Sequence, residues 1–168
     1  MIFLPYFFSI NIVILMYRLF KGYQLIIMQI ETHSFTINTR GNCDIKDITG
    51  EVEKLINENG FIEGNVLVFA GGSTAGITTI EYEPGLLQDY PAFFNKIAPV
   101  NLSYEHDNTW HDGNGHAHVR AALQGASFTV PFTNGNLLLG TWQQIIFIDF
   151  DNRSRRREVI VQLTGRKN

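Results

Sequence analysis

The sequence predicts an α+β fold with a mostly antiparallel sheet and a few helices. Segments rich in β-branched and aromatic residues outnumber segments with helical spacing of apolar residues. The last four of these strand-like segments are consecutive, and Asn134-Gly135 between two of them is a strong signal for a hairpin turn. A run of strands joined by short turns favours an antiparallel sheet over alternating strand and helix units.

Length and composition indicate one domain. The chain has 168 residues and a formal net charge of −3, which gives no support to bulk attraction for nucleic acid. The single cysteine, Cys43, excludes an intrachain disulfide and fits a reducing compartment. We therefore predict a cytoplasmic protein that does not bind nucleic acid.

Residues 1–27 differ in composition from the rest of the chain. They are nearly all apolar up to Met16, lack the positive start of a secretory signal, and fall short of the roughly 20 apolar residues of a spanning helix. We interpret them as a spurious upstream extension, with residues 28–168 forming the single domain. The alternative is a genuine apolar N-terminal segment associated with a membrane, and without it no membrane partner is expected.

The elements of the N-terminal half follow from local patterns. β-branched residues predict a strand over residues 29–37, although its alternation is imperfect, and a turn follows. Asp47 caps a helix that ends before Gly60, because the apolar residues between them have helical spacing. A short apolar run predicts a strand over 65–70, and the β-branched run Ile77-Thr-Thr-Ile80 predicts another over 77–82.

The second half begins with a helix over residues 84–97, which has a wide apolar face and a potential kink at Pro91. A long histidine-rich loop follows, then a short helix over 117–123 that ends at Gly125. The four predicted C-terminal strands cover residues 127–132, 137–141, 143–150 and 158–163. Trp142 is expected in a core. The basic run Arg153–Arg157 is interpreted as a solvated turn and strand start, with phosphate binding by one arginine as the alternative.

Four of the five histidines lie between His106 and His118, in a segment that also contains Asp112 and Asn114. Imidazoles and carboxylates bind divalent metals and transfer protons near neutral pH. His106, His116 and His118 could together form a three-nitrogen metal site. Asp112 could serve as a further ligand. Alternatively, one or two of them only hydrogen-bond to loop backbone. On a helix, His116 and His118 would point about 200° apart.

Several other residues are candidates for ligand contacts. The turn Gly71-Gly-Ser-Thr74 lets backbone amides approach an anion, although it matches neither a P-loop nor a nucleophile elbow and also suits a plain flexible turn. Glu81 is a candidate carboxylate partner, and Arg120 a candidate phosphate ligand. Gln143, beside Trp142, is a candidate to contact a ligand.

A set of segments in this chain resembles the YjbQ family. They are Gly72-Ser-Thr-Ala-Gly-Ile-Thr-Thr-Ile-Glu81, His106, Asp112-Gly-Asn-Gly-His-Ala-His118, Val130-Pro131, Leu139-Gly-Thr-Trp-Gln-Gln144 and Asp149-Phe-Asp151. The resemblance covers about residues 28–165. It implies a compact, YjbQ-like α+β fold with a mostly antiparallel, β-sandwich-like core, assembled as a homotrimer with sites near subunit boundaries. It also implies secondary thiamine-phosphate synthase activity, a transferase reaction of thiamine biosynthesis that joins hydroxymethylpyrimidine pyrophosphate to a thiazole phosphate.

The synthase hypothesis assigns roles to the candidates. The catalytic group comprises His106, His116, His118, Ser73, Thr74 and Glu81. The residues that would bind the small phosphorylated substrate are Gly72, Asn114, Arg120 and Gln143. A divalent metal, Mg²⁺ or Zn²⁺, would be held by His106, His116, His118 and Asp112.

Two other functions and one departure from the family pattern bear on this hypothesis. The alternatives are a non-catalytic trimer that binds a metal or small ligand, and a metal-assisted phosphate-ester hydrolase. Many family members carry His-Thr-Thr-Ala where this chain has Gly72-Ser-Thr-Ala75. We interpret that difference as a branch variation rather than a loss of the site.

Overall fold

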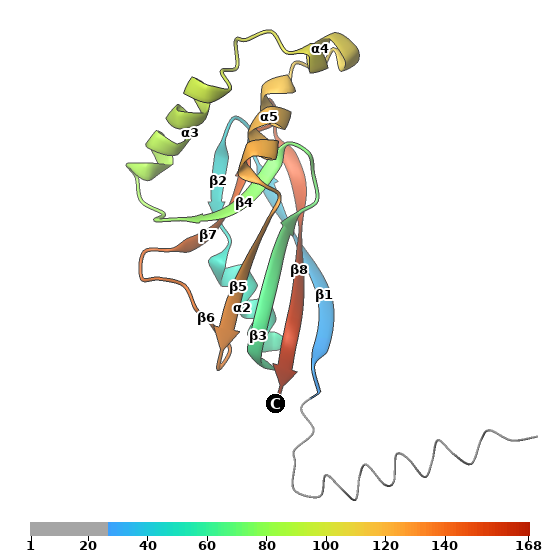
Figure 1. Ribbon diagram of the computed structural model, residues 1–168, viewed down its shortest axis with the longest axis vertical. Coiled ribbons are helices and arrows are strands. Elements are labelled where there is room, and N and C mark those ends of the chain that lie inside the picture. The colour runs from blue at the N-terminus through green and yellow to red at the C-terminus, as the bar shows by residue number, and fades with distance from the viewer. Residues whose placement is uncertain (1–26) are drawn as a thin grey trace, which may run out of the picture.

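The computed structural model describes residues 27–168, which form four helices and eight strands and confirm the α+β fold. In chain order these are β1 (Gln29–Thr39), β2 (Asp44–Asp47), α2 (Thr49–Glu58), β3 (Phe61–Ala70), β4 (Ala75–Ile80), α3 (Leu86–Ile97), α4 (Glu105–Trp110), α5 (Gly115–Gln124), β5 (Ser127–Thr133), β6 (Asn136–Leu137), β7 (Gln144–Asp149) and β8 (Arg155–Lys167) (Figure 1). Residues 1–26 lie outside the described part, so the interpretation of residues 1–27 as a spurious extension stays a prediction. Within the described part, none of the helices has the length and apolar character needed to cross a membrane.

All strand pairs are antiparallel and belong to two sheets. The five-stranded sheet has the order β1-β8-β3-β5-β6, and the three-stranded sheet has the order β2-β7-β4. The C-terminal strand β8 lies between β1 and β3, so both ends of the described domain meet in one sheet (Figure 1). Phe35 of β1 is opposite Val159 of β8. Val161, two residues further along β8, is opposite Val68 of β3. These pairs place apolar side chains on the inner face of the sheet.

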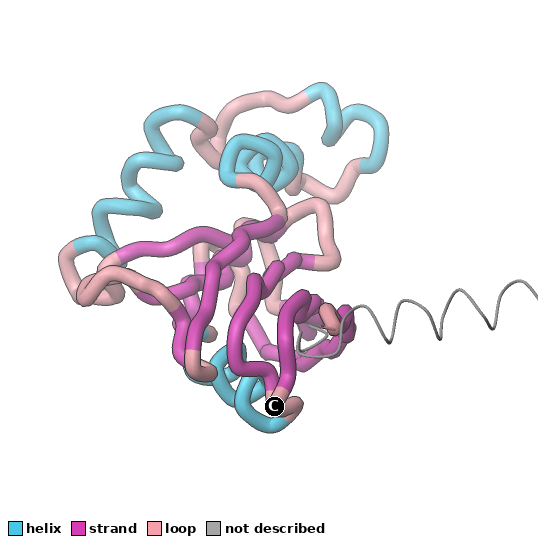
Figure 2. The backbone as a smooth tube through the Cα atoms, turned by 60° about the horizontal axis from the view of Figure 1, so that its bottom comes forward, coloured by secondary structure: helices cyan, strands magenta, loops and turns pink. Residues whose placement is uncertain are grey.

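Both faces of strand β7 are buried, so the strand lies between the two hydrophobic cores of the molecule. Ile145 and Phe147 pack into a core with α2 and the five-stranded sheet. Ile146 and Ile148, which point the other way, pack into a second core with α3 and α5. Successive side chains of a strand alternate between faces, so the unbroken apolar run of β7 supplies both cores at once. Figure 2 shows α3 and α5 on the side of the three-stranded sheet away from the five-stranded sheet.

Local sequence patterns correctly predicted several of these elements. Helix α2 lies where the sequence predicts it, but its N-cap is Ile48, which makes no side-chain cap hydrogen bond. Asp47, one residue earlier, accepts hydrogen bonds at Oδ1 from the Thr49 amide at 2.9 Å and from the Thr49 hydroxyl at 2.6 Å. The imperfect apolar alternation predicted for β1 is confirmed, because Ile30 lies on the exposed face whereas Phe35 and Ile37 pack against the core on the other face. The basic run is a turn that leads into β8 at Arg155, as predicted, but it is not fully solvated, because Arg155 and Arg157 form ion pairs with buried aspartates.

The predictions were wrong at four places. The expected loop between α3 and α5 contains a helix of its own, α4, and α5 begins at Gly115 rather than at residue 117. Strand β2 was missed because its four residues are too few to show a period. The strand expected over 137–141 is reduced to the two residues of β6. Trp142, expected in a core, lies in the β6–β7 connection with 68% of its surface exposed.

The close approach of β3 and β8 at Gly64 generates the first testable prediction. A Cβ at Gly64 of β3 would lie 2.1 Å from the Thr164 backbone oxygen and 2.6 Å from the Gly165 Cα of β8. We expect Gly64→Ala to lower the free energy of unfolding by at least about 2 kcal/mol, since two backbones must separate. Gly50→Ala is the control, because nothing lies within 4 Å of its Cβ, and its helical site should gain about 0.5–1 kcal/mol. Urea unfolding measures the free energy of unfolding of both variants. Equal values would contradict the close packing of β3 against β8 at Gly64.

Candidate functional site

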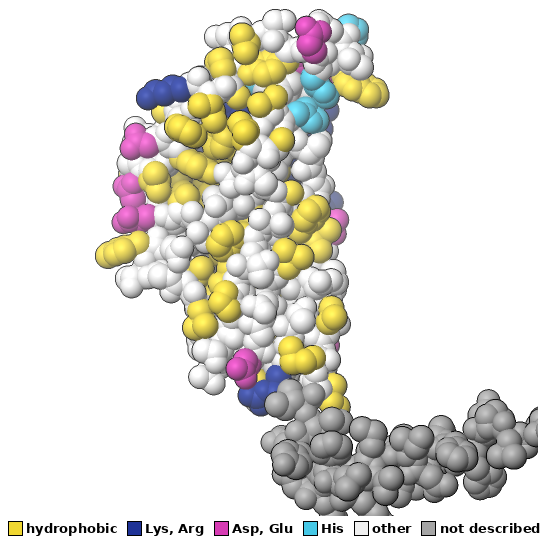
Figure 3. All heavy atoms as spheres, in the orientation of Figure 1, with side chains coloured by type: hydrophobic (Ala, Val, Ile, Leu, Met, Phe, Trp, Pro, Cys, Tyr) yellow, Lys and Arg dark blue, Asp and Glu magenta, His cyan; other side chains and the backbone are white. Residues whose placement is uncertain are grey.

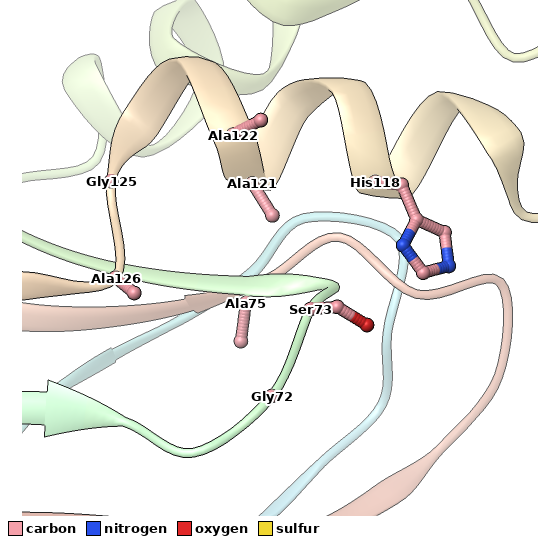
Figure 4. Close-up of a pocket in the computed structure, with 8 residues that line it drawn as sticks. All are labelled: Gly72, Ser73, Ala75, His118, Ala121, Ala122, Gly125 and Ala126. Atoms are coloured by element: carbon pink, nitrogen blue, oxygen red, sulfur yellow. The ribbon is translucent and has the colours of Figure 1, made fainter.

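A pocket of about 390 Å³ lies between the turn that precedes β4 and one face of α5. Its lining consists mainly of small residues, namely Gly72, Ser73, Ala75, His118, Ala121, Ala122, Gly125 and Ala126. Figure 4 shows His118 and Ser73 at one end of this pocket and the alanines toward the other. The short side chains leave space for a ligand, and the two polar groups give the pocket one reactive end.

His118 is paired with His106, which reaches it from α4. Their ring centroids are 4.1 Å apart with an interplanar angle of 38°, and both residues are half-buried. His106 Nε2 also lies 3.6 Å from Asp112 Oδ1. Burial, followed by the neighbouring His106, lowers the pKa of His118 below its ordinary value of 6.5. His118 is therefore predominantly neutral at pH 7 and has one nitrogen to donate a hydrogen bond and one to accept.

His116 lies on the other side of α5 from the pocket. It is 1% exposed, its ring centroid is 6.2 Å from that of Tyr104, and its Nε2 has no hydrogen-bond partner among residues 27–168. Burial and the charge of Arg120 lower its pKa below the ordinary value of 6.5. The divergence of His116 and His118 is what a helix requires of residues two apart. The structure thus brings His106 to His118 but turns His116 away from both.

The predicted metal ligands do not form a ready coordination site. Between residues 27 and 168, no three His, Cys, Asp or Glu side chains are grouped so that they could hold a metal ion. Asp112 lies near His106, but the His116 ring is buried against Tyr104. The three-nitrogen arrangement therefore does not fit this geometry. A requirement for Mg²⁺ or Zn²⁺ stays a prediction.

A buried network of charges fixes the turn that forms the floor of the pocket. Arg157 of β8 donates to both oxygens of Asp149, from Nε at 2.8 Å and from Nη2 at 2.7 Å. The same Nη2 donates to Thr74 Oγ1 at 2.7 Å, and Thr74 in turn donates to Asp151 Oδ2 at 3.1 Å. Arg155 Nε also donates to Asp151 Oδ2, at 2.8 Å. Because its hydroxyl is used in this way, Thr74 positions the turn.

Asp149 and Asp151 stood out in the sequence only as the ends of the motif Asp149-Phe-Asp151 in the family resemblance. Both are almost fully buried, at 0% and 1% exposure. Burial opposes ionisation of Asp151, but the hydrogen bonds from Arg155 and Thr74 outweigh it and lower its pKa. Burial likewise opposes the charge of Arg157, but Asp149 and Asp151 raise its pKa. The available signal was the proximity of an acidic pair to a basic run.

Arg120, the predicted phosphate ligand, is not part of the pocket. It is 1% exposed, and its Nε and Nη2 donate to the Ala98 carbonyl at 2.9 and 2.7 Å. Nη2 also donates to Asn95 Oδ1 at 2.7 Å, and Nη1 lies 3.1 Å from Cys43 Sγ. The guanidinium thereby caps the C-terminal end of α3, where carbonyl dipoles attract a cation. Its helical position turns it inward, so within one chain it does not reach the pocket, and its predicted phosphate contact stays untested.

Glu81 and Gln143 lie at the far end of the three-stranded sheet from the histidines. Ala75 of β4 is opposite Asp149, whereas Ile80 is opposite Gln144, so the strand separates the two ends by about 17 Å. Gln143 Oε1 accepts from the Gly140 amide at 2.8 Å, and its Nε2 contacts Thr79 Oγ1 at 3.4 Å. Both side chains are exposed. Within one chain they do not join the pocket, and their predicted roles stay untested.

Asn114 occupies the position just before α5 and holds the start of the helix. Its backbone carbonyl accepts from the amides of Ala117 and His118, at 2.8 and 3.3 Å. The residue is 4% exposed, and its Oδ1 has no hydrogen-bond partner in the described part of the chain. Asp107 Oδ1 accepts from the Gly115 amide at 2.9 Å and so joins α4 to α5. Asn114 therefore lies behind the histidine pair and does not line the pocket.

The buried histidines generate a prediction about pH. The folded state lowers the pKa of His116, so the unfolded chain binds the proton more readily. This contribution to stability is complete above pH 6.5 and is lost as the pH falls below 6.5. Asp151 and Asp44, whose pKa values are lowered from 3.8, act in the same direction only below pH 3.8.

We therefore expect the free energy of unfolding to fall between pH 6.5 and pH 4.5, and to fall less steeply in His116→Gln. Urea unfolding at a series of pH values measures both slopes, with exposed His111→Gln as the control for loss of one histidine. An identical slope in His116→Gln and the unmutated protein would show that His116 does not carry this dependence.

Known proteins resemble this chain over nearly the whole described domain. Residues 33–166 match the family model described as UPF0047 protein YjbQ-like. A UPF0047 protein of Archaeoglobus fulgidus is 38% identical over 128 residues, which cover 76% of this chain and 98% of the relative. The UPF0047 protein YugU of Bacillus subtilis is 37% identical over 131 residues, covering 77% and 96%.

Solved structures agree with the sequence relatives. A YbjQ-like protein of unknown function from Sulfolobus solfataricus has a TM-score of 0.77 at 30% identity, covering 83% of this chain and 99% of that one. An uncharacterised conserved YjbQ/UPF0047 protein of Clostridium acetobutylicum has a TM-score of 0.72 at 36% identity, covering 78% and 98%. Sequence and fold together show that this chain belongs to the YjbQ family.

Proposed function

We propose that this protein is an enzyme that acts on a phosphorylated heterocycle in the pocket beneath α5. The specific reaction we propose is the formation of thiamine phosphate from hydroxymethylpyrimidine pyrophosphate and a thiazole phosphate. The observation that carries the proposal is the shared position of His118 and Ser73 at one end of the pocket, with His106 stacked against His118. This places proton-transfer groups where a phosphorylated substituent would lie.

The pocket shape supports a flat substrate ring. Ala75, Ala121 and Ala122 present only methyl groups, and Gly125 presents none. A pyrimidine ring placed among these residues would direct its substituent toward His118 and Ser73. We infer that the small side chains select a planar heterocycle, while the polar end recognises the group that leaves.

The proposed chemistry is a substitution at carbon. The thiazole nitrogen forms a bond to the methylene carbon of the pyrimidine, the carbon–oxygen bond breaks, and its electron pair leaves with pyrophosphate. Neutral His118 would donate a hydrogen bond to the departing oxygen, with His106 beside it to exchange the proton. Ser73, whose side chain is exposed at the same end, would donate a second hydrogen bond.

We also propose that the protein assembles as a homotrimer in the cytoplasm. Exposed apolar side chains on α3 and α5 support self-association; they are Phe93, Ile97, Val119 and Leu123, with exposures of 55%, 47%, 41% and 63%. Figure 3 shows hydrophobic side chains gathered over the region of these two helices. Apolar patches of this kind are typical of interaction surfaces.

The proposed trimer can be tested by its mass in solution. Light scattering after gel filtration should give three times the mass of one chain, and Leu123→Glu should reduce it by placing a charge in the interface. Leu138→Glu, which changes an equally exposed leucine on the β6–β7 connection, should keep the mass of three chains. A monomer before any substitution would contradict the proposal.

The enzymatic proposal is tested by supplying both thiamine precursors to the full chain, with and without Mg²⁺ or Zn²⁺. We expect thiamine phosphate and pyrophosphate to form together, and His118→Ala to reduce the rate about a hundredfold or more, because a group at the leaving oxygen is lost. His33→Ala removes a histidine of β1 and should leave the rate unchanged. Circular dichroism establishes that both variants are folded.

The products distinguish the alternatives. Release of inorganic phosphate from a single substrate, without any need for the thiazole, would indicate a phosphate-ester hydrolase. Tight binding of the precursors without any product would indicate a binding protein. Full activity in His118→Ala would remove the histidine pair from the mechanism.

A further inference from the structure

Arg157 has one nitrogen that the buried network leaves free. Its Nε and Nη2 donate to Asp149, Asp151 and Thr74. Nη1 makes no hydrogen bond within residues 27–168 and lies next to Gly72, which lines the pocket. The network therefore holds the guanidinium rigidly and presents one donor toward the pocket floor.

Two backbone amides of the same turn are also free. The Gly72 amide donates to the Ala70 carbonyl at 2.8 Å, and Ala75 enters the pairing of β4 with β7. The amides between them, from Ser73 and Thr74, donate to no acceptor within the described residues. Unpaired successive amides are a recurrent way of binding a phosphate oxygen, especially beside an arginine.

The absence of a side chain at residue 72 keeps this place open. A Cβ on Gly72 would lie 3.1 Å from Arg157 Nη1, which is closer than ordinary contact. Gly72 has no left-handed backbone angle, so the turn itself does not require glycine. The space beside Nη1 is what the glycine provides.

We propose that Gly72 opens a seat for a phosphate group, formed by Arg157 Nη1 and the amides of Ser73 and Thr74. This inference rests on the proposed function and deepens it, because it assigns the leaving pyrophosphate of the substrate to this seat. The two arginines and two aspartates of the network balance in charge. The seat therefore attracts anions by directed hydrogen bonds rather than by net charge, and it suits a pyrophosphate better than a carboxylate with fewer oxygens.

The seat also orders the ligand within the pocket. The pyrophosphate would lie over the Gly72–Thr74 turn, and His118 would face the oxygen that joins it to the ring. The ring would extend toward Ala121 and Ala122. Arg157 thus takes the role that the sequence assigned to Arg120.

Gly72→Ala tests the seat without disturbing the buried ion pairs. The added methyl group meets Arg157 Nη1, so we expect pyrophosphate to bind the full chain at least about tenfold more weakly in isothermal titration calorimetry. Gly71→Ala is the matched control, because its Cβ would have only ordinary contacts at 3.9 Å with Glu158 and Ile160, and its affinity should equal that of the unmutated protein. Inorganic pyrophosphate is the probe, and thermal unfolding verifies that both variants are folded.

The pyrophosphate titration and the precursor assay together distinguish a failure of this inference from a failure of the proposed enzymatic function. Equal pyrophosphate affinity in Gly72→Ala and the unmutated protein would overturn the seat, even if thiamine phosphate were formed. Weakened binding in Gly72→Ala would support the seat, even if the precursor assay gave no product. Binding that disappears equally in Gly71→Ala would overturn it as well, because the effect would then come from the turn rather than from the space beside Nη1.

Discussion

The ion pair between Arg157 and Asp149 is the interaction on which the candidate site depends. It joins β8 of the five-stranded sheet to the end of β7 in the three-stranded sheet, and Thr39 of β1 adds a hydrogen bond to Asp149 at 2.5 Å. Removing one partner of such a buried pair costs about 3–5 kcal/mol, because the other charge stays buried. The same guanidinium holds Thr74, so the geometry of the pocket floor follows directly from the packing of the two sheets.

The roof of the pocket depends on a different constraint, the double burial of β7. Its two faces must both be covered, and α5 covers one of them with Ala117 and Ala121. This fixes the rotation of α5 about its axis. His118 then lies one residue beyond Ala117 and lines the pocket, while His116 lies one residue before it and is buried. The choice of the reactive histidine is therefore a consequence of core packing rather than of local sequence.

Periodicity and turn residues predicted the fold well but could not predict the site in full. The apolar run of β7 and the helical spacing of α2 identify themselves, because their patterns arise from burial over many residues. The pairing of His106 with His118 depends on how α4 folds back on α5, which no short pattern reveals. Arg120 and Arg157 look alike as phosphate ligands in the sequence. Only the rotation of α5 and the register of β8 decide that Arg120 is enclosed at the end of α3, whereas Arg157 lies next to Gly72 of the pocket lining.

A crystal structure of the full chain with inorganic pyrophosphate would test the central claim most directly, namely that the network shapes the floor of the pocket into an anion site. We expect a pyrophosphate within hydrogen-bonding distance of Arg157 Nη1 and of the amides of Ser73 and Thr74, with His118 facing it. A pyrophosphate bound only near Glu81 and Gln143, or an Arg157 side chain that leaves Asp149 when the anion binds, would contradict the account.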